Sequence, residues 1–138
     1  MKTQGLINSL IFCEIKTHKT HLLKQVSNSY RPEIWSASDE LTGGIMQIQK
    51  TVQKSILNIK SKTEIENERG ELTGERLFLY QPKSFLVIGS LQEFIGDNKN
   101  INEQKYSSFE LFRRNLTNPT IITFDELYDR ARHIIKSI

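Results

Sequence analysis

The chain has 138 residues, enough for one domain with a substantial core, and its single cysteine excludes an internal disulfide and a cysteine-rich zinc site. Its 37% hydrophobic and 25% charged residues are typical of a globular protein, and no apolar run approaches the roughly 20 residues of a membrane-spanning helix. The net charge is only +3, but residues 1–31 hold five basic residues and one acidic residue, and this local excess favours a polyanionic partner.

The first ten residues, MKTQGLINSL, lack the continuous apolar centre of a signal peptide, so a cytoplasmic location is expected. Residues 10–16 are rich in Ile, Leu and Phe, which is typical of a strand buried on both faces. Cys13 in this strand is expected to be a small core side chain. Residues 17–37 have no periodicity and include an Arg-Pro pair, which predicts a long loop. Loops of this length are often functional.

A long helix is the clearest element of the sequence. Apolar residues recur at spacings of three and four, so they define one face of an α-helix; they are Leu41, Ile45, Ile48, Val52, Ile56 and Ile59. Ser36 or Ser38 is expected to cap its first turn. Gly43 and Gly44 each cost about 1 kcal/mol relative to alanine in a helix, which indicates close approach of another backbone or a ligand.

The second half of the chain alternates strands and helices. Residues 63–75 are polar with two glycines, which predicts a flexible surface connection. Strands are expected at 77–80, 85–89 and 120–124, and a helix at 104–116. Thr123 and Glu126 match a capping box that opens a final helix. Its apolar face consists of Leu127, Tyr128, Ala131, Ile134 and Ile135. This order indicates an α/β domain with a mixed sheet.

Glu14 and Lys16 stand two residues apart at the end of the first predicted strand. Side chains alternate across a strand, so both project from one face. A carboxylate beside an ammonium group suits phosphodiester hydrolysis, because the carboxylate holds Mg²⁺ while the cation positions or deprotonates water and offsets phosphate charge. On spacing alone, such a triplet is more often an exposed ion pair than a catalytic site. The position of the pair at the end of a core strand favours a catalytic site over an ion pair without function, because a charge on a core strand is costly unless it is paired or binds a ligand.

Other residues are candidates for the same chemistry. Gln47 lies one turn after Gly43 and Gly44 and would orient a metal-bound water or a phosphate oxygen, whereas Gln49 borders the apolar stripe. A solvated surface glutamine is the alternative interpretation. Lys19, Lys24 and Arg31 are candidates for contacts with DNA phosphates.

Four segments of the sequence resemble the nuclease domain of the Shedu anti-phage defence proteins, a branch of the PD-(D/E)xK nuclease superfamily. They are FCEIKTHKTHLL, YRPEIWSASDELTGGIMQIQKTVQ, FLVIGS and SSFELFRRNLTNPTIITFDELYDRARHII. The resemblance spans nearly the whole chain. It implies a restriction-endonuclease-like α/β core, with a mixed sheet flanked by helices, in a single nuclease-like domain of residues 1–138.

The resemblance also implies site residues and a function. Glu14 would be a metal ligand, Lys16 the water-positioning or electrophilic residue, and Gln47, in preference to Gln49, the helical glutamine. The expected activity is metal-dependent DNA cleavage in bacterial anti-phage immunity, with Mg²⁺ as cofactor and Mn²⁺ able to substitute. The expected partners are DNA and further copies of the chain in a homo-oligomer, with no membrane.

One departure from the family pattern bears on activity. The family carries an aspartate on the strand before E-x-K, but no acidic residue precedes Glu14 here. The start of the chain is therefore expected to be the remainder of a truncated hairpin, with the first strand elements missing and activity impaired. Asp39 or Glu40 would supply a second carboxylate only if the helix start turns toward the strand end. The alternatives are a non-catalytic module for nucleic-acid binding or assembly, and a restriction or repair nuclease outside defence.

Overall fold

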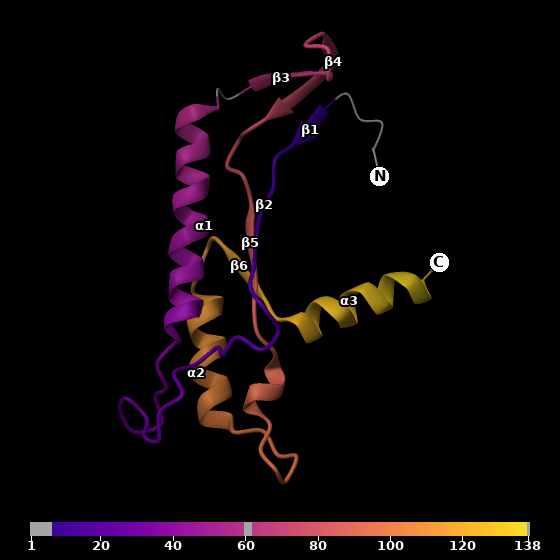
Figure 1. The fold of residues 1–138 in the computed structure, drawn as a ribbon. Helices are drawn as coiled ribbons and strands as arrows, with labels where there is room; N and C mark the ends of the chain where they lie inside the picture. The colour runs from indigo at the N-terminus through magenta and orange to yellow at the C-terminus, as the bar shows by residue number, and fades with distance from the viewer. Residues whose placement is uncertain (1–6, 60–61, 138) are drawn as a thin grey trace.

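A computed structural model describes residues 7–59 and 62–137 of the chain. Three helices and one short 3-10 helix accompany six strands in the described residues (Figure 1). In chain order the elements are β1 (Ile7–Ser9), β2 (Phe12–Ile15), α1 (Asp39–Asn58), β3 (Lys62–Glu66), β4 (Leu72–Phe78), β5 (Ser84–Val87), η1 (Leu91–Phe94), α2 (Glu103–Arg114), β6 (Thr120–Ile122) and α3 (Phe124–Lys136).

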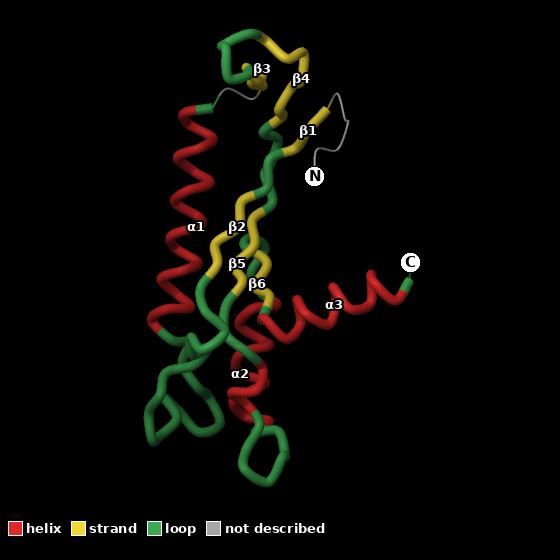
Figure 2. Tube along the Cα trace, turned by 45° about the vertical axis from the view of Figure 1, so that its right-hand side comes forward, coloured by secondary structure: helices red, strands yellow, loops and turns green. Residues whose placement is uncertain are grey.

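The strands form two three-stranded sheets that continue one another. β2, β5 and β6 are parallel in the order β2-β5-β6, whereas β4 pairs in parallel with β1 and antiparallel with β3. Because β1 leads into β2 and β4 leads toward β5, the sheets make one long ribbon (Figures 1 and 2). The predicted α/β class with a mixed sheet flanked by helices is confirmed.

The core lies between sheet β2-β5-β6 and helices α1 and α2. One buried cluster joins the sheet to the two helices; its members include Leu86 of β5, Ile121 of β6, Leu41 and Ile45 of α1, and Phe109 of α2. The apolar stripe predicted for α1 is buried as far as Val52, but Ile56 is 44% exposed because the last turns of α1 extend beyond this cluster. These helices therefore cover one face of the parallel sheet.

The predicted connection at 63–75 is wrong, because it holds strand β3 and the start of β4. The two strands form an antiparallel hairpin closed by a turn in which Gly70 has a φ of 76°. Residues 64 to 75 of this hairpin are largely exposed, so polar residues occupy both of its faces. Without a buried face there is no apolar alternation to reveal a strand.

Two further predictions need correction at the strand ends. The predicted strand at 85–89 ends at Val87. Gly89 has a φ of 62°, outside the strand region, and a Cβ there would lie 2.7 Å from Leu22 Cδ2 and from the Thr20 carbonyl oxygen. Residue 124 opens α3 instead of closing a strand. The long loop at 17–37, the Ser38 cap and the capping box at Thr123 are confirmed.

The first predicted strand is not buried on both faces. Phe12 and Glu14 are half-buried, whereas Cys13 is exposed and Ile15 is 66% exposed. The prediction of Cys13 as a core residue is wrong, because the described helices pack on the opposite face of β2. The expected remainder of a hairpin falls partly on residues 1–6, outside the described residues. Ile7–Ser9 pairs in parallel with β4 and not with β2.

None of the helices in the described ranges is both long enough and apolar enough to cross a bilayer.

Candidate active site

Glu14, Lys16 and Gln47, predicted from different parts of the sequence, meet in the structure. Lys16 Nζ lies 3.7 Å from Glu14 Oε1 and donates a long hydrogen bond of 3.5 Å to Gln47 Oε1. Glu40 Oε2 lies 3.8 Å from the same nitrogen. We call these four residues the Lys16 centre. Gln49 instead donates to the Asn118 carbonyl, so Gln47 is the glutamine at the centre.

The backbone of β2 and the start of α1 position this centre. Glu14 is in register with Leu86 of the central strand, and the Lys16 amide donates to the Val87 carbonyl at 2.9 Å. Gly44 lets α1 approach, because a Cβ there would lie 3.2 Å from Leu86 Cδ1 and 3.6 Å from Lys16 Cε. The close approach expected of the two glycines is therefore confirmed for Gly44, whereas a Cβ on Gly43 would meet nothing within 4 Å.

Matched valine substitutions at the two glycines measure this close approach. Gly44→Val is expected to lower the free energy of unfolding by about 1–3 kcal/mol, because the added methyl groups overlap Leu86. Gly43→Val should stay within about 0.5 kcal/mol of the parent, because the space around it is open. Urea unfolding of both variants makes the comparison, and equal stabilities would contradict the packing described above.

The carboxylates at the helix start have different partners. Glu40 turns toward Lys16, as the second-carboxylate hypothesis required, whereas Asp39 Oδ1 pairs with Lys24 Nζ at 3.0 Å. The side chains of Glu14 and Lys16 are each 25% exposed and that of Glu40 is 68% exposed. The Lys16 centre is therefore a partly screened cluster that opens to solvent on the Glu40 side.

The donor set suits a hard divalent cation. Glu14, Glu40 and Gln47 each present an oxygen within 3.8 Å of one atom, Lys16 Nζ, and Mg²⁺ prefers oxygen ligands while retaining several waters. Within the described residues, no group of three or more His, Cys, Asp or Glu side chains is arranged to hold a metal. Two carboxylates and one amide oxygen are thus the groups of this centre that would hold a hydrated cation.

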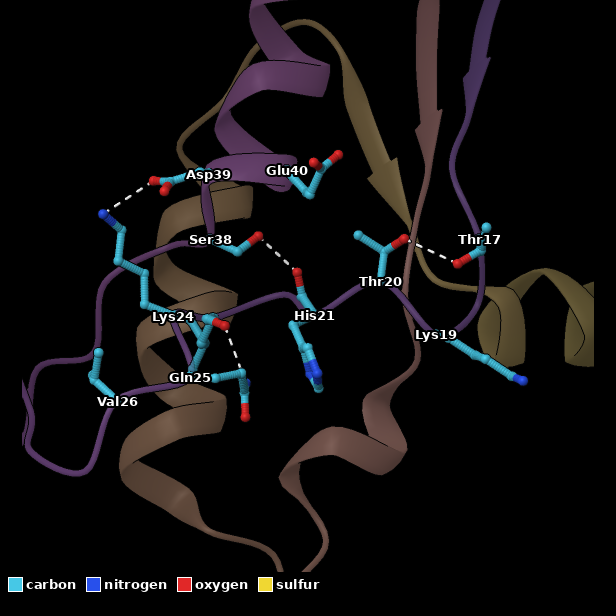
Figure 3. A pocket seen from close by; sticks show the side chains of 11 residues that line it. Thr17, Lys19, Thr20, His21, Lys24, Gln25, Val26, Ser38, Asp39 and Glu40 are labelled. Carbon is cyan, nitrogen blue, oxygen red and sulfur yellow. Dashed lines mark hydrogen bonds and ion pairs between the residues drawn. The ribbon is translucent and has the colours of Figure 1, made fainter.

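Two of the three predicted DNA contacts lie beside this centre. Lys19 and Lys24 line an open cavity of about 520 Å³ that also includes Asp39 and Glu40 (Figure 3). Lys24 lies against Asp39 on one side of the cavity, and Lys19 projects from the other. Arg31 is not among the lining residues and stacks on Tyr30, 5.7 Å from the ring centre.

Sequence reasoning missed Glu93, which holds the loop that carries these lysines. Its side chain is 13% exposed. Its carboxylate accepts hydrogen bonds from the amides of Leu22 at 2.6 Å and Leu23 at 3.1 Å, and from Gln25 Nε2 at 3.0 Å. A glutamate in a short 3-10 helix carries no local signal for this role, because its partners are about 70 residues away in the sequence.

Removing this carboxylate should release the loop. Glu93→Ala leaves two part-buried amides without their acceptor, and we expect the free energy of unfolding to fall by about 1–3 kcal/mol. Trypsin should then cleave faster after Lys19 and Lys24. The neighbouring Gln92→Ala serves as the control, because its exposed side chain has no such partners. Unchanged trypsin cleavage in Glu93→Ala would exclude this anchoring role.

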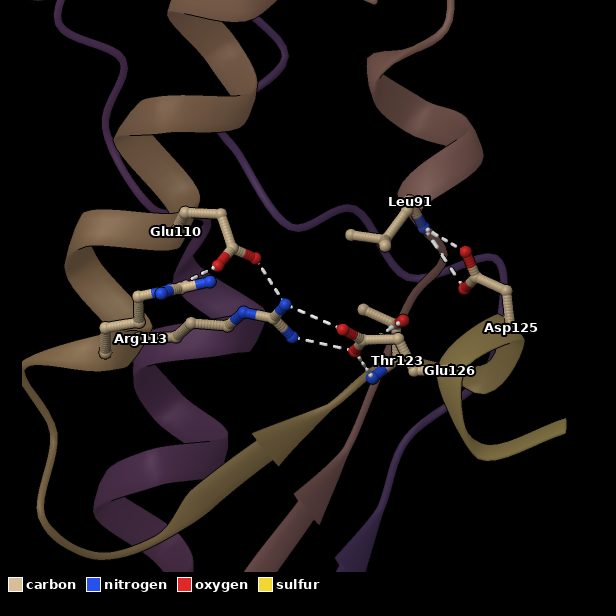
Figure 4. A network of polar contacts seen from close by, with 7 residues as sticks. Leu91, Glu110, Arg113, Thr123, Asp125 and Glu126 are labelled. Atoms are coloured by element: carbon tan, nitrogen blue, oxygen red, sulfur yellow. Dashed lines mark hydrogen bonds and ion pairs between the residues drawn. The ribbon is translucent and has the colours of Figure 1, made fainter. Parts of the chain in front are cut away.

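A second charged cluster, made of other residues than the Lys16 centre, joins α2 to α3 (Figure 4). Arg113 donates two hydrogen bonds of 2.7 Å to Glu126 and also pairs with Glu110. Burial disfavours the Glu126 charge, but hydrogen bonds from Arg113 and Thr123 outweigh it and lower the pKa of Glu126 to about 2. This network stabilises the junction of the two helices.

Comparison with known proteins agrees with the sequence resemblance. A family model described as "Shedu protein SduA, C-terminal" matches residues 1–128. The Shedu protein SduA of Bacillus cereus (strain B4264) is 32% identical over 129 residues, which are 91% of this chain and 30% of that protein. The chain thus spans about a third of the length of this curated relative. It belongs to the family of Shedu SduA C-terminal domains.

Proposed function

We propose that this chain is a metal-dependent DNA nuclease domain of an anti-phage defence protein. The observation that carries the proposal is the convergence of Glu14, Glu40 and Gln47 on Lys16 Nζ, within 3.5 to 3.8 Å. Family membership and the basic residues Lys19 and Lys24 beside the centre support it. Cytoplasmic location, Mg²⁺ as cofactor and DNA as substrate are parts of the same proposal.

The residues divide into three groups with different tasks in the proposed reaction. Glu14, Glu40 and Gln47 would hold a divalent cation through their oxygens, and a bound cation supplies Lewis-acid polarisation of a phosphate oxygen and a more acidic water. The Lys16 ammonium orients the attacking water and offsets charge that develops on the phosphate. Lys19 and Lys24 hold neighbouring phosphates without reading the base sequence.

A non-catalytic module for DNA binding or assembly is the second candidate. It is favoured by the small number of acidic ligands, because Glu14 and Glu40 are the only carboxylates paired with Lys16 among the described residues. In that case the Lys16 centre would be a structural ion pair at the rim of a phosphate-binding surface.

Cleavage and metal binding by the same chain distinguish the two candidates. The nuclease proposal expects double-stranded DNA to be cut with Mg²⁺ or Mn²⁺, and calorimetric titration with Mn²⁺ to detect a single site that Glu14→Gln removes. DNA binding with neither cleavage nor a Mn²⁺ site would favour the non-catalytic module. Absence of DNA binding, cleavage and Mn²⁺ binding would reject the nuclease proposal and leave assembly as the remaining role.

A further inference from the structure

The long loop at 17–37 ends in a tight turn that exposes apolar side chains. The Tyr30 amide donates to the Ile34 carbonyl at 2.9 Å, and the Ile34 amide donates to the Arg31 carbonyl at 3.0 Å. Tyr30 is 71% exposed and Ile34 is 53% exposed, as is nearby Val26 at 52%. We call residues 30–34 the 30–34 turn. The loop that carries it extends past the start of α1 (Figures 1 and 2), and apolar side chains gathered on such a projection indicate a binding partner.

The base of the loop is fixed to the body, so the 30–34 turn is held in place. The Lys24 amide donates to the Ser36 carbonyl at 3.0 Å, which closes the base of the loop. Trp35 packs against the core cluster, and its amide donates to Ser108 Oγ of α2 at 3.1 Å. A turn that is ordered before binding loses little conformational entropy when it meets a partner.

The same loop borders the open side of the Lys16 centre. Val26 lines the cavity that also includes Lys24 and Glu40 (Figure 3). Glu40 is the carboxylate on the solvent-exposed side of the centre. A polymer that lies across this side, with one phosphate at the centre, therefore continues onto the long loop.

The charges of the loop identify the partner as a polyanion. Residues 17–37 hold three basic residues, Lys19, Lys24 and Arg31, against one acidic residue, Glu33. The exposed ion pair of Lys24 with Asp39 is of a kind that contributes little free energy, so a phosphate can replace the aspartate. Arg31 is exposed and lies over the Tyr30 ring, 5.7 Å from its centre. A cation beside an exposed aromatic ring suits nucleic acid, which offers both phosphates and bases.

We propose that the 30–34 turn is a wedge that enters the minor groove of the DNA bound at the Lys16 centre. Tyr30 and Ile34 insert at a base step, and Arg31 lies in the negative potential of the groove. Apolar side chains together with arginine are the usual contacts of proteins that bind this groove. The wedge would fix the position of the duplex along the protein, so these three are positioning residues. The identity of the partner rests on the proposed function.

DNA binding measured without cleavage tests the wedge. Fluorescence anisotropy of a labelled duplex in EDTA gives the dissociation constant over a series of salt concentrations. Tyr30→Ala should raise it about 10-fold at every salt concentration, because stacking on a base is lost and no counterion is involved. Arg31→Met should instead lower the slope of log Kd against log salt by about 1. Tyr80→Ala is the matched control, because Tyr80 is also 69% exposed but lies between β4 and β5, and it should bind like the parent.

Netropsin, which fills the minor groove of A·T-rich DNA, tests the groove. It should weaken binding of the parent to an A·T-rich duplex about 10-fold more than binding of a variant with both Tyr30→Ala and Ile34→Ala, because that variant has lost its side chains from the groove. Circular dichroism of all variants should match the parent, since the replaced side chains are exposed. An equal effect of netropsin on parent and variant would overturn placement in the minor groove.

These measurements separate the wedge from the nuclease proposal. If Tyr30→Ala bound DNA as tightly as the parent, the wedge would be wrong, whether or not the chain cleaves DNA. If Tyr30→Ala weakened binding and the parent did not cleave DNA with Mg²⁺ or Mn²⁺, the wedge would stand and the nuclease proposal would fail. A parent that binds no DNA would overturn the wedge.

Discussion

Lys16→Met should abolish metal-dependent DNA cleavage but not metal binding. We expect cleavage to fall by at least about 100-fold, because the substitution removes the ammonium group that lies among the three oxygens. Mn²⁺ binding should be retained or become tighter, because the ammonium group no longer competes for Glu14, Glu40 and Gln47. Gel-based cleavage and calorimetric titration measure the two effects separately.

Glu14→Gln should behave in the opposite way toward the metal. It removes one of the two carboxylates near Lys16 Nζ, so both cleavage and Mn²⁺ binding should be lost. The control is Lys50→Met, on an exposed side chain of α1, which should leave both properties unchanged. If Lys16→Met or Glu14→Gln cleaved DNA as fast as the parent, the Lys16 centre would have no role in the cleavage reaction.

The largest expected effect on stability is at Arg113. Arg113→Met should lower the free energy of unfolding by about 3–5 kcal/mol, because Glu110 and Glu126 lose their shared partner while their side chains are only 9% and 25% exposed. Urea unfolding at neutral pH gives the value. Arg69→Met, on the exposed hairpin, is the matched control and should change stability by less than about 0.5 kcal/mol. An equal effect of the two substitutions would show that the network contributes nothing.

The same network predicts how stability depends on pH. The folded-state pKa of Glu126, about 2, lies below its ordinary value of 4.5. Its contribution is therefore complete above pH 4.5 and is lost as the pH falls toward 2. The loss should be on the order of 2 kcal/mol after allowance for solvent screening. Unfolding of the parent and of Glu126→Gln at pH 7 and pH 3 measures it: the difference in stability should be smaller at pH 3 than at pH 7, and a constant difference would contradict the assignment.

Sequence patterns were informative wherever one face of an element is buried. The helix α1 follows from residue spacing, because burial of one face imposes a period of 3.6 on the sequence. The Ser38 cap and the capping box of α3 follow from local cap motifs, and β5 follows from a short apolar run. The hairpin of β3 and β4 was missed because both of its faces are largely exposed, and exposed faces impose no apolar pattern on the sequence. The single-domain organisation expected for residues 1–138 stays a prediction.

The sequence by itself determined the α/β class, the family, and Glu14, Lys16 and Gln47 as candidates, because strand alternation and local motifs are properties of neighbouring residues. Only the tertiary structure decided that Glu40 joins them and Asp39 does not, that Glu93 holds the long loop, and that α3 exposes its apolar face. These facts depend on how segments tens of residues apart pack together. The close approach at Gly44 and the exposed outer face of β2 also depend on this long-range packing, which local sequence periodicity does not encode.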